Sequence, residues 1–162
     1  MANAELLLPS QPAEAYKSLN LFYPIRRDYA TCSLELGFNW TEAMHDLPLG
    51  KFYVVGFRSQ RKELNHKQTA ALYRMDDRSF EEAVGKPGLL LYFRGTLEAE
   101  RNCTSACLWE SEEQALVGSG GPEHMLARAK ALKVWYEFYD VERWNVFHRP
   151  DDPPIFEEVQ LR

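Results

Sequence analysis

The sequence predicts an α+β fold with the ferredoxin-like order β-α-β-β-α-β after an N-terminal extension, paired with a second copy as a dimeric α/β barrel. Three observations predict it: four segments with the composition of strands, two helical segments between them, and glycine or proline at most of the boundaries. We therefore expect residues 1–50 to form an extension packed on the domain, residues 51–149 the ferredoxin-like domain, and residues 150–162 a C-terminal arm.

The N-terminal extension has the weakest pattern. Residues 1–27 contain three prolines and are expected to form an irregular arm. Residues 28–36 alternate between polar and apolar side chains, which suits either a strand or a short helix, because periodicity alone does not separate the two over so short a run. Thr41 is a candidate cap for a short turn that Pro48 ends.

The first half of the domain has clear strand and helix signals. Residues 51–59, FYVVGF at their centre, are rich in aromatic and β-branched side chains and predict a strand. Residues 69–85 have a helical composition and stop at a glycine that precedes proline. Residues 88–95 form a second strand bounded by glycines, and residues 102–111 a third.

The second helical region is broken by glycines. Ser111 is a plausible N-cap for residues 112–118, and Pro122 restarts the helix after Gly120 and Gly121 in the first-turn position that proline favours. The fourth strand is expected at 141–149. The restarted helix has apolar side chains at a 4-3-4-3 spacing, which predicts one buried stripe: Met125, Ala129, Leu132, Tyr136 and Tyr139.

The predicted strands are apolar on both faces, although the helices of this fold cover only one face of the sheet. The second face therefore needs another cover. Either a second subunit packs sheet against sheet, which gives the homodimer, or the N-terminal extension covers it. The dimer is the preferred expectation.

Composition limits the partners. Of 162 residues, 45% are hydrophobic and 13% aromatic, enough for a core and an aromatic-lined pocket. The formal net charge is −5 and there is no basic tract, so nucleic acid is not an expected partner.

We find no signal-peptide pattern and no apolar run near the ~20 residues of a membrane span. The odd cysteine count, with no framework spacing, suggests a reduced cytoplasmic protein.

Several segments together resemble a family of small, mostly uncharacterised fungal proteins. They are RDYA…GFNW, FYVVGFRS, FEEAVGKPGLLLYFRG, RNCTSACLWES, PEHMLARAKAL and YEFYDVERW, and they span about residues 28–148. That family belongs to the dimeric α/β-barrel superfamily, with antibiotic-biosynthesis monooxygenases, polyketide cyclases and haem-degrading relatives. The resemblance implies the fold and says little about the reaction.

One departure from that family concerns the first helix. Where the family is expected to read Ala-His-x-Glu-Ala, this chain has Ser79-Phe80-Glu81-Glu82-Ala83. If position 80 faces a pocket, an acid/base group has been replaced by an aromatic wall, which favours a reaction driven by shape over a proton relay. A repacked core is the alternative.

No cofactor is expected from the motifs. The four histidines form no metal-binding pair, no Cys-x-x-Cys occurs, and no glycine-rich loop follows a strand in the dinucleotide pattern. We therefore expect no metal and no nucleotide cofactor. Haem and flavin leave no reliable short motif in this fold, so their absence does not follow from the sequence.

The candidate site residues are polar or aromatic groups within apolar elements. Leu90, Tyr92 and Arg94 share one face of their strand by alternation, and an apolar face with Tyr and Arg is typical of a pocket wall. Tyr92, Arg94 and His124 are the predicted catalytic residues; His124 lies in a helical first turn, which lowers a histidine pKa. The predicted substrate-binding residues are Tyr53, Arg58, Phe80, Trp109 and Trp135.

These candidates suggest a cofactor-independent cyclase of fungal-type secondary metabolism that acts on an apolar small molecule. In its most specific form this is a pericyclase of the Diels–Alder type, since folding the substrate and donating a hydrogen bond to a carbonyl require no metal or nucleophile. Two alternatives stay open: a cofactor-independent monooxygenase, and a non-catalytic dimeric protein that binds small molecules or serves in stress responses.

Overall fold

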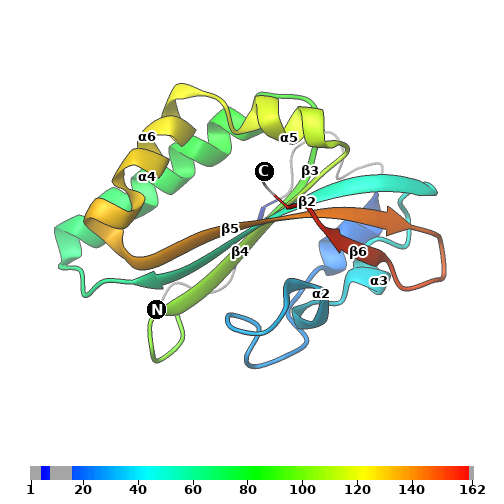
Figure 1. Cartoon of the computed structure of the whole chain (residues 1–162), viewed down its shortest axis with the longest axis horizontal. Helices are drawn as coiled ribbons and strands as arrows, with labels where there is room; N and C mark the ends of the chain where they lie inside the picture. The colour runs from blue at the N-terminus through cyan, green and yellow to red at the C-terminus, as the bar shows by residue number, and fades with distance from the viewer. Residues whose placement is uncertain (1–4, 8–15, 161–162) are drawn as a thin grey trace.

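The computed structural model describes residues 5–7 and 16–160, and they build one antiparallel sheet between two layers (Figure 1). The sheet order is β1-β3-β4-β2-β5-β6. Its strands are β1 (Glu5–Leu7), β2 (Gly50–Arg61), β3 (Leu89–Arg94), β4 (Asn102–Trp109), β5 (Tyr136–His148) and β6 (Ile155–Glu158). The inner four strands, with the helices between them, confirm the predicted ferredoxin-like order.

One face of the sheet carries the long helices (Figure 1). They are α4 (His66–Val84), α5 (Glu112–Gly118) and α6 (Pro122–Lys130), with a π-helical turn η2 (Ala131–Trp135) leading into β5. Asn65 and Gln68 cap α4 reciprocally through their side chains, and Ser111 caps α5 as predicted. No helix in the described part of the chain combines the length and apolarity needed to cross a membrane.

The other face of the sheet is covered by residues 16–49 of the same chain. This segment contains η1 (Lys17–Leu21), α2 (Leu34–Gly37) and α3 (Trp40–Ala43), which lie on the side opposite the long helices (Figure 1). Its buried aromatic side chains contact the sheet: Phe22 stacks on Phe38 at 4.9 Å between ring centroids, and Phe38 meets Phe93 of β3 edge-on at 5.1 Å. In the ambiguous stretch 28–36, the structure has α2 beginning at Leu34 and no strand.

The double-sided apolarity of the strands is thus accounted for within one chain. A dimer through the sheet is expected only if one face of the sheet is left uncovered. In the structure, the N-terminal extension of the same chain covers that face. The homodimer stays a prediction, but an uncovered sheet face no longer supports it.

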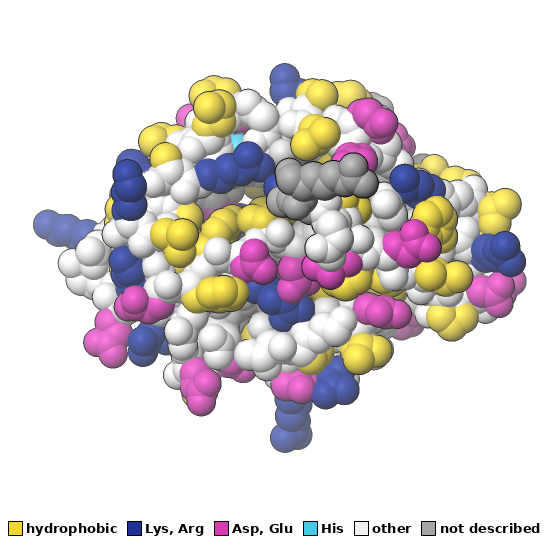
Figure 2. Space-filling model, in the orientation of Figure 1, with side chains coloured by type: hydrophobic (Ala, Val, Ile, Leu, Met, Phe, Trp, Pro, Cys, Tyr) yellow, Lys and Arg dark blue, Asp and Glu magenta, His cyan; other side chains and the backbone are white. Residues whose placement is uncertain are grey.

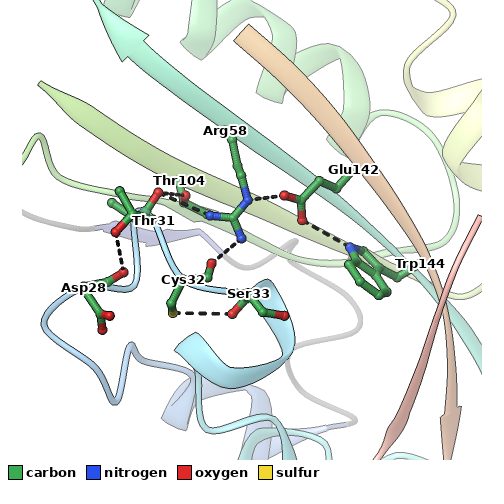
Figure 3. A network of polar contacts seen from close by, with 9 residues as sticks. Asp28, Thr31, Cys32, Ser33, Arg58, Thr104, Glu142 and Trp144 are labelled. Carbon is green, nitrogen blue, oxygen red and sulfur yellow. Dashed lines mark hydrogen bonds and ion pairs between the residues drawn. The ribbon is translucent and has the colours of Figure 1, made fainter. Parts of the chain in front are cut away.

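A polar network ties the N-terminal layer to the sheet (Figure 3). The Arg58 guanidinium of β2 pairs with Glu142 of β5 and donates to the backbone carbonyls of Ala30 and Cys32. Thr104 of β4 also donates to the Ala30 carbonyl, at 3.0 Å. Arg58 therefore acts on the side of the sheet away from the long helices, and its role in substrate binding stays a prediction.

Two local predictions need correction. A β-bulge between Leu89 and Leu91 breaks the alternation, so Leu90 packs in the N-terminal layer while Tyr92 faces the helices. The predicted stripe on the second helix is not buried: Met125 and Leu132 are 63% and 56% exposed. Tyr136 and Tyr139 belong to β5, which begins five residues earlier than expected.

Candidate functional site

A cavity of about 150 Å³ lies between the helix layer and the sheet. Its floor is the set of side chains of β2, β3, β4 and β5 that point toward the helices, and its roof comes from α4, α5, α6 and η2. Figure 2 shows a hollow with hydrophobic side chains between these layers and with positively charged side chains at its rim. A cavity of this size can hold about one aromatic ring.

The cavity brings together seven of the eight predicted site residues, which come from five different elements and η2. Only Arg58 lies elsewhere. The seven that line it are Tyr53, Phe80, Tyr92, Arg94, Trp109, His124 and Trp135. Cys103 and Cys107 share this face with Tyr92, whereas Phe93 lies in the N-terminal layer. The roles assigned to the seven residues stay predictions.

The main polar cluster of the cavity centres on Asp76 of α4. The Tyr92 hydroxyl donates to its Oδ1 at 2.8 Å, and Arg94 Nε lies 2.7 Å from its Oδ2. Arg94 also contacts Asp77 at 3.0 Å through Nη2. Burial raises the pKa of Asp76 above its usual value, and Arg94 and the Tyr92 hydrogen bond only partly oppose it. Asp76 is therefore a carboxylate held at the wall of an apolar space, with a proton affinity higher than that of an exposed aspartate.

Sequence reasoning missed Asp76, although a signal for it exists. The buried face of α4 is formed by Leu72, Met75, Ser79 and Ala83, and Asp76 is the charged residue four positions after Leu72. A carboxylate on the apolar face of an amphipathic helix needs a partner or a function. The cavity thus has a titratable group at Asp76 as well as the aromatic wall expected at Phe80. Phe80 itself stacks on Tyr92 at 5.5 Å.

His124 also belongs to the roof of the cavity and lies in the first turn of α6. Its Nδ1 is 3.7 Å from Oε1 of Glu82, and the other oxygen of Glu82 accepts from the backbone N–H of Glu123 at 2.7 Å. Glu82 thus caps α6, and it comes so close to Gly121 that a Cβ there would collide with it. Burial lowers the pKa of His124, with a further contribution from the positive charge of Arg128, and Glu82 opposes the shift only in part, so the ring is neutral near neutral pH.

Two hydroxyl groups face the cavity without a hydrogen-bond partner among the described residues. They belong to Tyr53, whose side chain is 2% exposed, and to Ser79 on α4. Ser79 follows Asp76 by three residues, which places both side chains on the same face of the helix. Buried hydroxyls are normally satisfied, so both are available to an oxygen atom of a ligand.

No group of three His, Cys, Asp or Glu side chains within residues 5–7 and 16–160 is arranged to hold a metal ion. The sulfur atoms in the cavity are poor ligands in their resting state, because burial raises the pKa of Cys103 to about 11 and that of Cys107 well above the usual thiol value.

Comparison with known proteins places the chain in a family. The family model described as PB2B2.08-like matches residues 4–153, which is most of the chain. The chain belongs to the PB2B2.08-like family. No curated protein sequence matches this PB2B2.08-like chain.

Solved structures similar to the PB2B2.08-like chain share about 12–14% of its sequence. NE2512, a protein of unknown function from Nitrosomonas europaea, has a TM-score of 0.48 at 14% identity, covering 61% of this chain and 92% of that one. A putative antibiotic biosynthesis monooxygenase from the same organism scores 0.47 at 12%, covering 57% and 86%. SnoaB, a cofactor-independent oxygenase from Streptomyces nogalater, scores 0.43 at 14%, covering 61% and 93%. With TM-scores below 0.5, they assign no reaction to this chain.

Proposed function

We propose that the protein is a cofactor-independent cyclase for an apolar small molecule that carries carbonyl groups. The observation that carries the proposal is Asp76, a buried carboxylate with a raised pKa at the wall of an aromatic cavity. Such a group is suited to remove a proton from a carbon next to a carbonyl. This favours a cyclisation that starts with proton abstraction over the pericyclic form, which would use the shape of the cavity and need no base.

The reaction can be written with the side chains of this cavity. Asp76 takes the α-proton of one carbonyl, and the enolate oxygen receives a hydrogen bond from the free hydroxyl of Ser79. The enolate carbon then forms a bond to a second carbonyl carbon of the same molecule. The resulting alkoxide takes the proton back from Asp76, which leaves a cyclic hydroxyketone and the original carboxylate.

Arg94 and Tyr92 hold Asp76 in this mechanism. Their contacts of 2.7 and 2.8 Å fix the two carboxylate oxygens and stabilise the negative charge against part of the effect of burial. Their predicted roles as direct donors to the substrate therefore become positioning roles. Arg94→Met is expected to raise the pKa of Asp76 further and so to shift the acid limb of a pH–rate profile upward, whereas a residue with only a structural role would leave that limb in place.

Heptane-2,6-dione is a suitable probe, because an intramolecular aldol reaction turns it into a cyclic hydroxyketone, and acid treatment of quenched samples then removes water to give an enone that absorbs in the ultraviolet. The protein should accelerate this cyclisation, and Asp76→Asn should lose about 10²-fold or more of the acceleration, the usual contribution of a general base. Asp77→Asn is the matched control: Asp77 is the next residue, it is 56% exposed and it does not line the cavity. Equal rates for wild type and Asp76→Asn would refute the role of Asp76.

A cofactor-independent monooxygenase is the second candidate. It would begin with the same proton abstraction, after which the substrate carbanion would react with dioxygen beside the aromatic side chains Trp109 and Trp135. Turnover that needs dioxygen, measured in an oxygen electrode with an enolisable substrate, would favour this reaction over cyclisation. Binding without turnover in either assay would leave the non-catalytic binding protein.

A further inference from the structure

The cavity wall has the opposite charge to the protein as a whole. The chain has a formal charge of −5, yet Arg61, Arg94, Arg128 and Arg143 line the cavity and Asp76 is the single carboxylate among the described residues that do so. Arg94 is compensated by Asp76 and Asp77. In the described part of the chain, the other three arginines have no carboxylate within ion-pair distance.

Arg61 is the best placed of the three. It ends β2, where its backbone N–H donates to the Arg101 carbonyl at 2.9 Å and its own carbonyl accepts from Arg101 Nε at 2.8 Å. Its guanidinium lies 5.2 Å from the ring centre of Tyr73, and Nη1 contacts the Tyr73 hydroxyl at 3.3 Å. Its Nε is buried without an acceptor among the described residues. A positioned guanidinium with a buried unused donor is suited to bind an anionic oxygen.

The chemistry of the wall favours a carboxylate over a phosphate. Phosphate sites commonly use the backbone N–H groups at a helix start, but Glu82 already occupies the start of α6. The planar donors of the remaining guanidinium match two oxygens of a carboxylate as well as of a phosphate, so the occupied helix start is what favours the carboxylate. We propose that the ligand is an amphipathic carboxylic acid: an apolar, ring-sized body fills the cavity and its carboxylate pairs with Arg61. This rests on the proposed function, since it assumes that the cavity is the ligand site.

The probe pair is 3-phenylpropanoate and 3-phenylpropanamide, which share one aromatic ring and differ in charge. Titration calorimetry of the full chain near neutral pH should show the acid binding about 10- to 100-fold more tightly than the amide, as expected for charge-assisted hydrogen bonds. Arg61→Met keeps most of the apolar stem and should abolish this preference while leaving the amide's affinity unchanged. Arg78→Met, on the exposed side of α4, is the control and should keep it.

Each other outcome has a distinct meaning. If acid and amide bind equally to the wild type, or if Arg61→Met keeps the preference, the carboxylate site is refuted and the apolar cavity of the proposed function survives. If neither ligand binds to the wild type, the cavity is not a ligand site, and both proposals fail. A Lys substitution guards against a misfolded Met variant: Arg61→Lys keeps the charge and should retain part of the preference, and loss of all binding in a folded Arg61→Lys would contradict the proposal.

Discussion

Replacing Arg58 tests whether the network under the sheet holds the N-terminal layer in place. Arg58 and Glu142 each have side chains that are 15% exposed, and Arg58 also donates to the carbonyls of Ala30 and Cys32. Arg58→Met would leave Glu142 buried with only the indole N–H of Trp144, at 3.3 Å, as a partner. Breaking a buried ion pair from one side typically costs about 3–5 kcal/mol, and we expect about 3 kcal/mol here because both groups keep some contact with water.

That loss is large enough to measure by urea unfolding and by melting. For a chain of this size each kcal/mol corresponds to about 2–4 °C, so the melting temperature should fall by roughly 6–12 °C. Arg26→Met is the control, because Arg26 pairs with Asp28 in the same N-terminal layer and both side chains are about half exposed. It should melt close to wild type.

A double variant shows whether the stability is lost because a buried charge is left unpaired or because packing is lost. Arg58→Met with Glu142→Leu leaves no buried charge and should recover part of the lost stability, as ion pairs replaced by apolar groups often do. Folded Arg58→Met should bind 3-phenylpropanoate like wild type, since Arg58 lies on the other side of the sheet. An Arg58→Met variant that melts like the Arg26→Met control would refute the structural role.

Two further predictions concern buried titratable groups. Near pH 8, iodoacetamide should label Cys32 but leave Cys103 and Cys107 of the native protein unmodified, because burial raises the pKa of both thiols; peptide mass spectrometry that finds all three labelled alike would contradict this. Stability should decline as the pH falls below 6.5, because burial lowers the folded-state pKa of His124 and His148 while the unfolded chain keeps the usual value and binds the extra protons. In melting curves between about pH 7 and pH 5, His124→Gln and His148→Gln should each flatten this slope, and two unchanged slopes would show that neither histidine is responsible.

The strand order was predictable because each strand and each helix has its own local signal. The two faces of the sheet were harder to assign. Tyr53 and Arg58 are five positions apart on a regular strand, so alternation alone places them on opposite faces, and both were expected at the site. Which face meets the helices depends on the pairing between strands: Tyr92 pairs with Cys107, and Cys107 with Val55, so Tyr92 shares the side of Val55 and Tyr53.

The second helix shows where a periodic pattern misled. The spacing of Met125, Ala129 and Leu132 suits a buried stripe, yet no residue of α6 is buried. The helix changes to a π-helical turn at Ala131 and the strand begins at Tyr136, so the pattern extends across three elements, and only its last two members, Tyr136 and Tyr139, line the cavity. The side chains that enter the cavity from this region include His124 and Trp135, which lie off that stripe. A periodic pattern indicates that one side of a helix is apolar, but the packing of the whole domain determines whether that side is buried.

Buried polar atoms without a hydrogen-bond partner are concentrated on the helix side of the sheet, although His148 Nδ1, toward the N-terminal layer, is another. On the N-terminal side, the Arg58 guanidinium has Glu142 and two backbone carbonyls as partners. On the helix side, Tyr53, Arg61, Ser79 and His124 each have a buried side-chain atom without a hydrogen-bond partner among the described residues, and all four line the same cavity. A folded chain normally satisfies such atoms, because each one left unpaired costs about 1–3 kcal/mol. Their concentration around one apolar space supports the proposal that the cavity binds an oxygen-bearing ligand.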